Sequence, residues 1–213
     1  QLSRFVFVSS LAAAGPSRDS EALATEESTP HPITWYGHSK LAAEELVRSA
    51  RDLPWTIVRP PIVFGPRDRD VFAYFQIVRR GWIPIAGWQD RYYSMIFAPD
   101  LAQGILRVAQ TPGARNQVYY LSSDEVVTWT GFGNLIAETL DARARVLRIP
   151  SLAVRLAGVW ADVAARLRGK PEIFSSQKVK EMLAGSWVCS SEKAARDIHW
   201  HAETPISEAV QKT

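Results

Sequence analysis

The feature that most constrains the fold is a set of short apolar runs without the polar-apolar alternation of a half-exposed strand. Three of them, Phe5–Val8, Trp55–Val58 and Gln117–Leu121, are rich in β-branched and aromatic residues. Strands that are apolar on both faces are typical of parallel sheets covered on both sides. We therefore expect three buried parallel strands, with Tyr92–Phe97 as a further short strand.

The segments between these runs have helical patterns. We expect helices at Ser39–Arg51, at Asp70–Arg80, which ends before Gly81, and at Asp100–Gln110. The Asp100 side chain is expected to cap the first free backbone N–H groups of its helix. Strands that alternate with helices predict an α/β protein with a doubly wound parallel sheet.

After Leu121 the pattern becomes mainly helical, which indicates a second, smaller lobe. Two apolar stripes have helical spacing. They consist of Phe132, Leu135, Ile136 and Leu140, and of Leu152, Leu156, Trp160, Val163 and Leu167. Around the second stripe lie Arg155, Asp162, Arg166 and Arg168, so binding to a membrane surface is one interpretation. We favour a second interpretation, in which this helix packs its apolar stripe against a neighbouring helix of the lobe. Residues 15–32, rich in Pro, Ser, Glu and Thr, are expected to form a surface loop.

Composition narrows the function classes. The 25 basic and 22 acidic residues are spread along the 213-residue chain, which argues against a nucleic-acid-binding stripe. The histidines and the single cysteine, Cys189, have no metal-ligand spacing, so we expect no metal. No apolar run approaches the roughly 18 residues of a membrane span. One cysteine fits a reducing compartment, so a cytoplasmic protein is expected. Because Gln1 is followed at once by a strand pattern, we expect the chain to be a fragment.

A candidate acid/base pair opens the first long helix. Tyr36 and Lys40 are four residues apart, so both side chains lie on one face of that helix. A nearby ammonium favours the phenolate form of a tyrosine, which makes the tyrosine a better proton acceptor. Hydride transfer at a carbonyl carbon needs a proton to move at the oxygen, and Tyr36 can carry that proton. The alternative is that Tyr36 and Lys40 are ordinary solvent-exposed residues of the helix surface, without a catalytic role.

Two other segments converge on the same region. The first strand runs into Ser9 and Ser10, at the carboxyl edge where ligands of open α/β sheets bind. The second strand continues into Arg59-Pro-Pro-Ile-Val-Phe-Gly-Pro66, a segment punctuated by Pro and Gly at the same edge. We therefore expect a catalytic crevice there, although each segment alone is also an ordinary strand exit.

These motifs, in this order, resemble the extended short-chain dehydrogenases/reductases, a family of NAD(P)-dependent epimerases, dehydratases and 3β-hydroxysteroid dehydrogenases. The resemblance covers Val8-Ser9-Ser10, Tyr36-Gly-His-Ser-Lys40 and Arg59–Pro66, where Phe64 replaces a Tyr. It implies that Ser10 positions the substrate hydroxyl, that Tyr36 is the acid/base and that Lys40 also binds the nicotinamide ribose. It further implies contacts with the nicotinamide and with substrate. The implied nicotinamide contacts are Pro60, Ile62 and Val63, and the implied substrate contacts are Ser9, Leu11, Phe64, Arg67 and Tyr93.

By the same resemblance, residues 1–121 are the remainder of a Rossmann dinucleotide-binding domain, with a substrate-lobe insert at about 66–93. Residues 122–213 form a mainly helical substrate-binding lobe. The family's Gly-rich pyrophosphate turn is absent from the chain. We therefore expect the fragment alone to be inactive and to bind NAD or NADP poorly.

The resemblance leaves several choices open. Tyr93 stands where sugar-nucleotide members often have an Arg, which favours an apolar alcohol over a nucleotide sugar. The leading function is an NAD(P)-dependent oxidoreductase or epimerase acting on a small-molecule alcohol or ketone. The alternative is a non-catalytic Rossmann-like subunit or regulator that binds a dinucleotide. The cofactor choice, the substrate and a homo-oligomeric state stay open.

Overall fold

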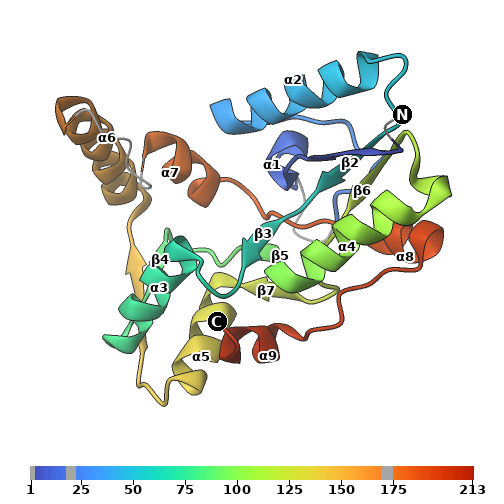
Figure 1. Ribbon diagram of the computed structural model, residues 1–213. Helices are drawn as coiled ribbons and strands as arrows, with labels where there is room; N and C mark the ends of the chain where they lie inside the picture. Colours follow the sequence, from blue (N-terminus) through green and yellow to red (C-terminus); the bar gives the residue numbers. More distant parts are fainter. Residues whose placement is uncertain (1–2, 18–22, 169–174) are drawn as a thin grey trace.

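A parallel sheet forms the first layer of the protein, as the apolar runs predict. The computed structural model describes residues 3–17, 23–168 and 175–213, and Figure 1 shows their arrangement. The sheet has the order β1-β2-β6, with bounds Phe5–Val8, Trp55–Arg59 and Gln117–Tyr120. All neighbours are parallel, with Phe5 opposite Trp55 and Thr56 opposite Gln117. The parallel α/β prediction is confirmed.

Helices cover this sheet. In Figure 1, α2 and α4 lie on opposite sides of β1 and β2. The covering helices are α1 (Leu11–Ala14), α2 (Trp35–Ser49), α4 (Ala98–Gln110) and the short 3-10 helix η1 (Pro112–Ala114). The helix α2 begins earlier than the expected Ser39, because Thr34 is its N-cap and accepts a hydrogen bond from the Gly37 N–H at 3.2 Å. The acid/base candidate Tyr36 therefore lies in the first turn.

The expected cap at Asp100 is wrong. The residue lies inside α4, whose N-cap is Phe97, and a side-chain cap is absent there. The helix starts two residues earlier than expected because Pro99 is well tolerated in a first helical turn. The buried Asp100 carboxylate instead accepts hydrogen bonds from the Thr204 N–H at 3.0 Å and the Thr204 hydroxyl at 3.1 Å. It thereby fixes the C-terminal segment against α4.

A second sheet and a two-stranded ribbon follow the first layer. The second sheet has the order β3-β5-β7, and the ribbon pairs β4 with β8 in parallel. Phe64, Phe97 and Phe132 meet in the core between these strands and the adjacent helices. The strands are β3 (Ile62–Phe64), β4 (Trp82–Ala86), β5 (Tyr92–Phe97), β7 (Val126–Thr128) and β8 (Arg145–Ile149), and the helices are α3 (Arg69–Arg79), α5 (Trp129–Thr139) and α9 (Ile206–Gln211).

The remaining helices pack in two different places. The pair α6 (Ser151–Arg168) and α7 (Ser176–Leu183) pack together at one side of the molecule in Figure 1. The helix α8 (Glu192–Ile198) instead returns to the first sheet, where Ala194, Ile198 and Trp200 join the core formed by Val58 and Tyr119. Side chains from the expected lobe at 122–213 therefore also complete the core of the first layer.

The strand β1 carries an open edge. Within the described ranges it pairs only with β2, and Phe5 and Val8 are partly exposed. When an apolar strand has an unpaired edge, its free backbone N–H and C=O groups tend to pair with a strand of another chain. We expect residues 1–213, produced alone, to self-associate in size-exclusion chromatography with light scattering. A monodisperse monomer over the whole concentration range would contradict this expectation.

Candidate functional site

Tyr36 is placed at the sheet edge by the N-terminus of α2. Thr34 is buried and caps the helix, so the position of the first turn is fixed from inside. The Tyr36 side chain itself is half exposed. Its hydroxyl is therefore accessible to a small molecule. A general acid or base must be accessible in this way, because it exchanges a proton with the substrate.

Lys40 follows Tyr36 by one turn, on the same face. Its ammonium lies 5.7 Å from the centre of the Tyr36 ring and 5.3 Å from that of Phe7. One Nζ–H donates a hydrogen bond to the Val8 carbonyl oxygen at 3.1 Å, which holds the cation at the end of β1. An ammonium has three donors, so the half-buried Lys40 can also bind ligand hydroxyls.

Ser10 is brought to the same edge by β1. It is the N-cap of the single-turn helix α1, and its Oγ accepts a hydrogen bond from the Ala12 N–H at 3.1 Å. The helices α1 and α2 touch closely, because a Cβ at Gly37 would lie 2.3 Å from the Ala12 carbonyl oxygen. A larger residue at position 37 would push these helices apart. The structure thus brings the segments that carry Ser10, Tyr36 and Lys40 together.

The end of β2 closes this arrangement. The Pro60 carbonyl oxygen accepts a hydrogen bond from the Leu11 N–H at 2.8 Å, so the Pro60 segment lies against the first residue of α1. Ile62 and Val63 follow in β3, half buried and opposite Met95 and Ile96 of β5. The three expected nicotinamide contacts are therefore continuous with the edge that carries Ser10.

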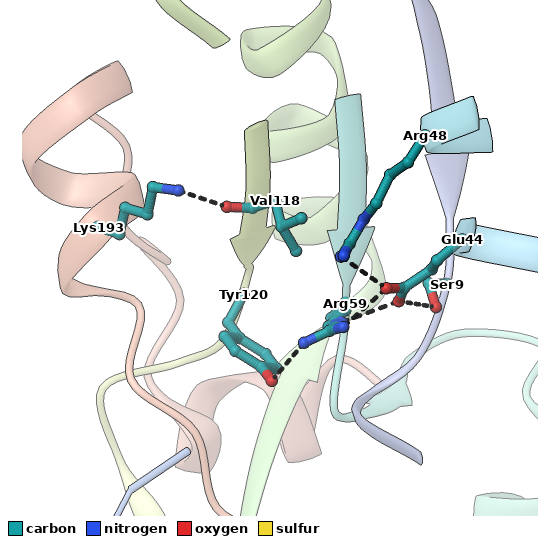
Figure 2. A network of polar contacts seen from close by, with 7 residues as sticks. All are labelled: Ser9, Glu44, Arg48, Arg59, Val118, Tyr120 and Lys193. Atoms are coloured by element: carbon teal, nitrogen blue, oxygen red, sulfur yellow. Dashed lines mark hydrogen bonds and ion pairs between the residues drawn. The ribbon is translucent and has the colours of Figure 1, made fainter. Parts of the chain in front are cut away.

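A buried ionic network lies beneath the edge, and Figure 2 shows it at close range. The Arg59 guanidinium donates to both carboxylate oxygens of Glu44, at 2.8 and 2.7 Å. Arg59 is 2% exposed and Glu44 is fully buried. The Ser9 hydroxyl donates to Glu44 at 2.6 Å, Arg48 adds a bond at 3.1 Å, and Arg59 donates to the Tyr120 hydroxyl at 3.1 Å. The network ties α2 to β2, to β6 and to Ser9, which directly follows β1.

The electrostatics of this network favour a charged Arg59. Burial by itself lowers the pKa of a guanidinium, but the hydrogen bonds to Glu44 and the neighbouring Tyr120 outweigh it and raise the pKa of Arg59. Burial raises the pKa of the Tyr120 hydroxyl to about 12, although Arg59 acts in the opposite direction. Tyr120 is therefore a neutral hydrogen-bond acceptor for Arg59 at physiological pH.

Three of the residues expected to contact substrate are buried in other roles. The Ser9 hydroxyl is occupied by Glu44, and Leu11 packs in the core next to Tyr120. Phe64 packs between Phe97 and Phe132 in the second core. Since their side chains are hardly accessible, we leave these three residues out of the site proposed below.

Arg67 and Tyr93 lie in different surroundings. Arg67 is exposed, has a φ of +73° and lines a cavity of about 320 Å³ together with Gly65, Asp68 and Phe72. Tyr93 is half buried in β5, and its ring meets that of Trp129 edge to face at 5.6 Å. Burial raises the pKa of the Tyr93 hydroxyl, so it stays neutral.

Glu44 is not among the residues that the sequence motifs indicate as functional. A usable signal was present, because Glu44 follows Lys40 by four residues and so continues the face that carries Tyr36 and Lys40. A second signal was an arginine at the end of the apolar run Trp55–Val58. A buried arginine requires a partner of opposite charge, and a glutamate on the covering helix is the natural candidate.

Curated proteins with similar sequences include a reductase and an epimerase. The chain is 30% identical over 195 residues to a ceramide reductase from Caulobacter vibrioides, covering 92% of this chain and 56% of the relative. It is 27% identical over 190 residues to an N-acetyl-α-D-glucosaminyl-diphospho-ditrans,octacis-undecaprenol 4-epimerase from Escherichia coli O157:H7, covering 84% and 55%. The chain thus spans about half the length of these curated relatives.

A solved structure supports the fold. The dTDP-glucose 4,6-dehydratase from Bacillus anthracis, in complex with NAD, superposes with a TM-score of 0.74 at 15% identity, covering 99% of this chain and 60% of that one. The family model described as the RmlD substrate binding domain matches residues 6–165. Since this match covers most of the chain, the protein belongs to the family of the RmlD substrate binding domain, within the extended short-chain dehydrogenases/reductases that its motifs resemble.

Proposed function

We propose that the complete protein is an NAD(P)-dependent oxidoreductase or epimerase that acts on a secondary alcohol or ketone. The observation that carries the proposal is the placement of Tyr36 and Lys40 on successive turns of α2, beside the α1 segment capped by Ser10. The names of the related reductase and epimerase, and the NAD in the similar dehydratase structure, support the same reaction class.

In this proposal each residue has a defined task. Tyr36 gives a proton to the ketone oxygen, or takes one from the alcohol, at its half-exposed hydroxyl. The Lys40 ammonium donates to ribose hydroxyls, while its bond to the Val8 carbonyl oxygen holds it on the same helix face as Tyr36. Ser10 donates to the reacting oxygen and so orients it towards Tyr36.

The edge of the sheet suits the nicotinamide half of a dinucleotide. Lys40 has donors for a ribose, and Ile62 and Val63, half buried beyond the buried Pro60, offer an apolar surface to a flat ring. When bound, the dinucleotide would supply or accept the hydride. An assay that follows nicotinamide absorbance during turnover by the complete protein tests the proposal. Tight dinucleotide binding without turnover of any alcohol, ketone or sugar would favour the non-catalytic alternative.

We further predict that the complete protein prefers an apolar alcohol or ketone over a nucleotide sugar. Tyr93 supplies an uncharged, half-buried ring next to Trp129, and such a surface stabilises apolar groups better than a diphosphate. Turnover of long-chain and steroid alcohols is compared with turnover of UDP-sugars under the same conditions. Selective turnover of the UDP-sugars would refute the prediction.

A further inference from the structure

The helix α6 exposes the apolar stripe that the sequence analysis expected to be packed, and that expectation is wrong. Its most exposed large side chains are Leu152 at 69%, Leu156 at 54%, Trp160 at 72% and Leu167 at 83%. Val159 and Val163 are also exposed. An exposed apolar face of this extent on an ordered helix marks an interaction surface. In Figure 1, α6 lies at the periphery of the molecule, with α7 beside it.

The contacts of α6 with α7 explain why the apolar stripe is exposed to solvent. The helix packs through small residues on its opposite face, where a Cβ at Gly158 would lie 2.7 Å from the Val179 side chain. Val154 is buried on that same side. A helix turns by about 100° per residue, so Val154 and Gly158 point away from Leu152, Leu156 and Val163. The close fit to α7 therefore leaves the larger side chains outside.

Basic residues flank the outer face. Arg155 and Arg166 are both exposed and lie next to Val159 on the helical projection, along one border of the stripe. The only acidic residue within 151–168 is Asp162, whose Oδ1 accepts a hydrogen bond from the Ser176 N–H at 3.2 Å. The face thus combines leucines, a tryptophan and an arginine border, which is typical of helices that lie in a membrane interface.

We propose that α6 docks on the surface of an anionic lipid bilayer, with its axis in the plane of the membrane. Leu152, Leu156 and Leu167 enter the boundary between headgroups and acyl chains, and Trp160 takes the interfacial position that indole rings prefer. Arg155 and Arg166 contact the lipid phosphates. No helix among the described ranges is long and apolar enough to cross a membrane.

A second copy of the chain fits this face less well. Antiparallel pairing of two α6 helices across a two-fold axis would bring like borders together, so Arg155 of one copy would meet Arg166 of the other. The one acid near this border, Asp162, is half buried and its Oδ1 accepts a hydrogen bond from the Ser176 N–H of α7, so it is turned away from a partner helix and offsets that repulsion only in part. An anionic lipid surface provides the missing negative charge, and we therefore commit to it as the occupant.

Vesicle sedimentation tests the proposal with the full-length protein, without cofactor or substrate. The vesicles are phosphatidylcholine alone, or equal parts phosphatidylcholine and phosphatidylglycerol. We expect binding to the anionic vesicles, and Leu156→Asp should weaken it about tenfold, the effect of no longer burying one leucine.

Leu106→Asp is the matched control, because Leu106 is 60% exposed on α4. It should leave binding unchanged, and Arg155→Glu with Arg166→Glu should abolish the preference for anionic lipid.

A second measurement does not depend on Leu156. Within residues 1–213 the one cysteine, Cys189, is buried. With any accessible cysteine elsewhere in the full-length protein replaced by serine, Ala153→Cys on the exposed face of α6 takes an environment-sensitive dye selectively. The dye should shift to a more apolar signal with anionic vesicles. Absence of binding and of the shift, or equal losses in the Leu156 and Leu106 variants, would overturn the proposal. So would a lipid-free dimer that Leu156→Asp converts to a monomer. Since neither assay involves turnover, their failure would leave the proposed function untouched.

Discussion

Replacing Tyr36 by phenylalanine in the complete protein should lower turnover by about 10² to 10⁴, the usual contribution of a general acid or base. The substitution removes only the hydroxyl, and the half-exposed ring can keep its place over α2. Dinucleotide affinity should change little, because Lys40 and the Pro60 segment retain their positions. Steady-state kinetics and calorimetric titration with NAD and NADP measure the two quantities separately.

Tyr92→Phe is the matched control for this experiment. Tyr92 is exposed to a similar degree, but it lies in β5 rather than on α2. It should keep near wild-type turnover. Equal activity of the Tyr36 and Tyr92 variants would remove Tyr36 from the proposed mechanism, while a joint loss of turnover and dinucleotide affinity in the Tyr36 variant would point to a structural role.

Arg59→Met should destabilise the protein by about 3–5 kcal/mol, the usual effect of removing one partner of a buried ion pair. The Glu44 carboxylate would stay fully buried and lose two short hydrogen bonds, leaving only Ser9 and the partly exposed Arg48 as partners. Glu44→Gln should have a similar effect, because it leaves the Arg59 charge without a counterion. Urea unfolding, followed by circular dichroism, measures the free energy of unfolding.

Two comparisons make this experiment specific. Glu208→Gln removes an exposed ion pair with Lys212, and such pairs contribute about 0–1 kcal/mol. The double variant with Glu44→Gln and Arg59→Met should lose less stability than the two single changes together, because no buried charge remains unpaired. A change of under about 1 kcal/mol for Arg59→Met would show that the buried pair does not stabilise the fold.

The sequence by itself determined the parallel strands and the shared helix face of Tyr36 and Lys40, because both depend on local periodicity. Continuous apolar runs predict buried strands, and β1, β5 and β6 start where they were expected. The spacing of Tyr36 and Lys40 fixes a shared helix face whatever the tertiary fold. The position of Ser10 followed from the end of an apolar run, and Ser10 does lie just beyond the carboxyl end of β1.

Only the tertiary structure decided which residues these elements meet. Arg59 and Glu44 are 15 residues apart, and nothing in their local patterns specifies that they pair inside the protein. Asp100 bonds Thr204 across 104 positions instead of capping its own helix. The stripe on α6 has the periodicity of a core helix, but small residues on the other face permit a closer approach to α7. Periodicity shows that a helix has an apolar face, whereas the packing of its neighbours determines whether that face is buried.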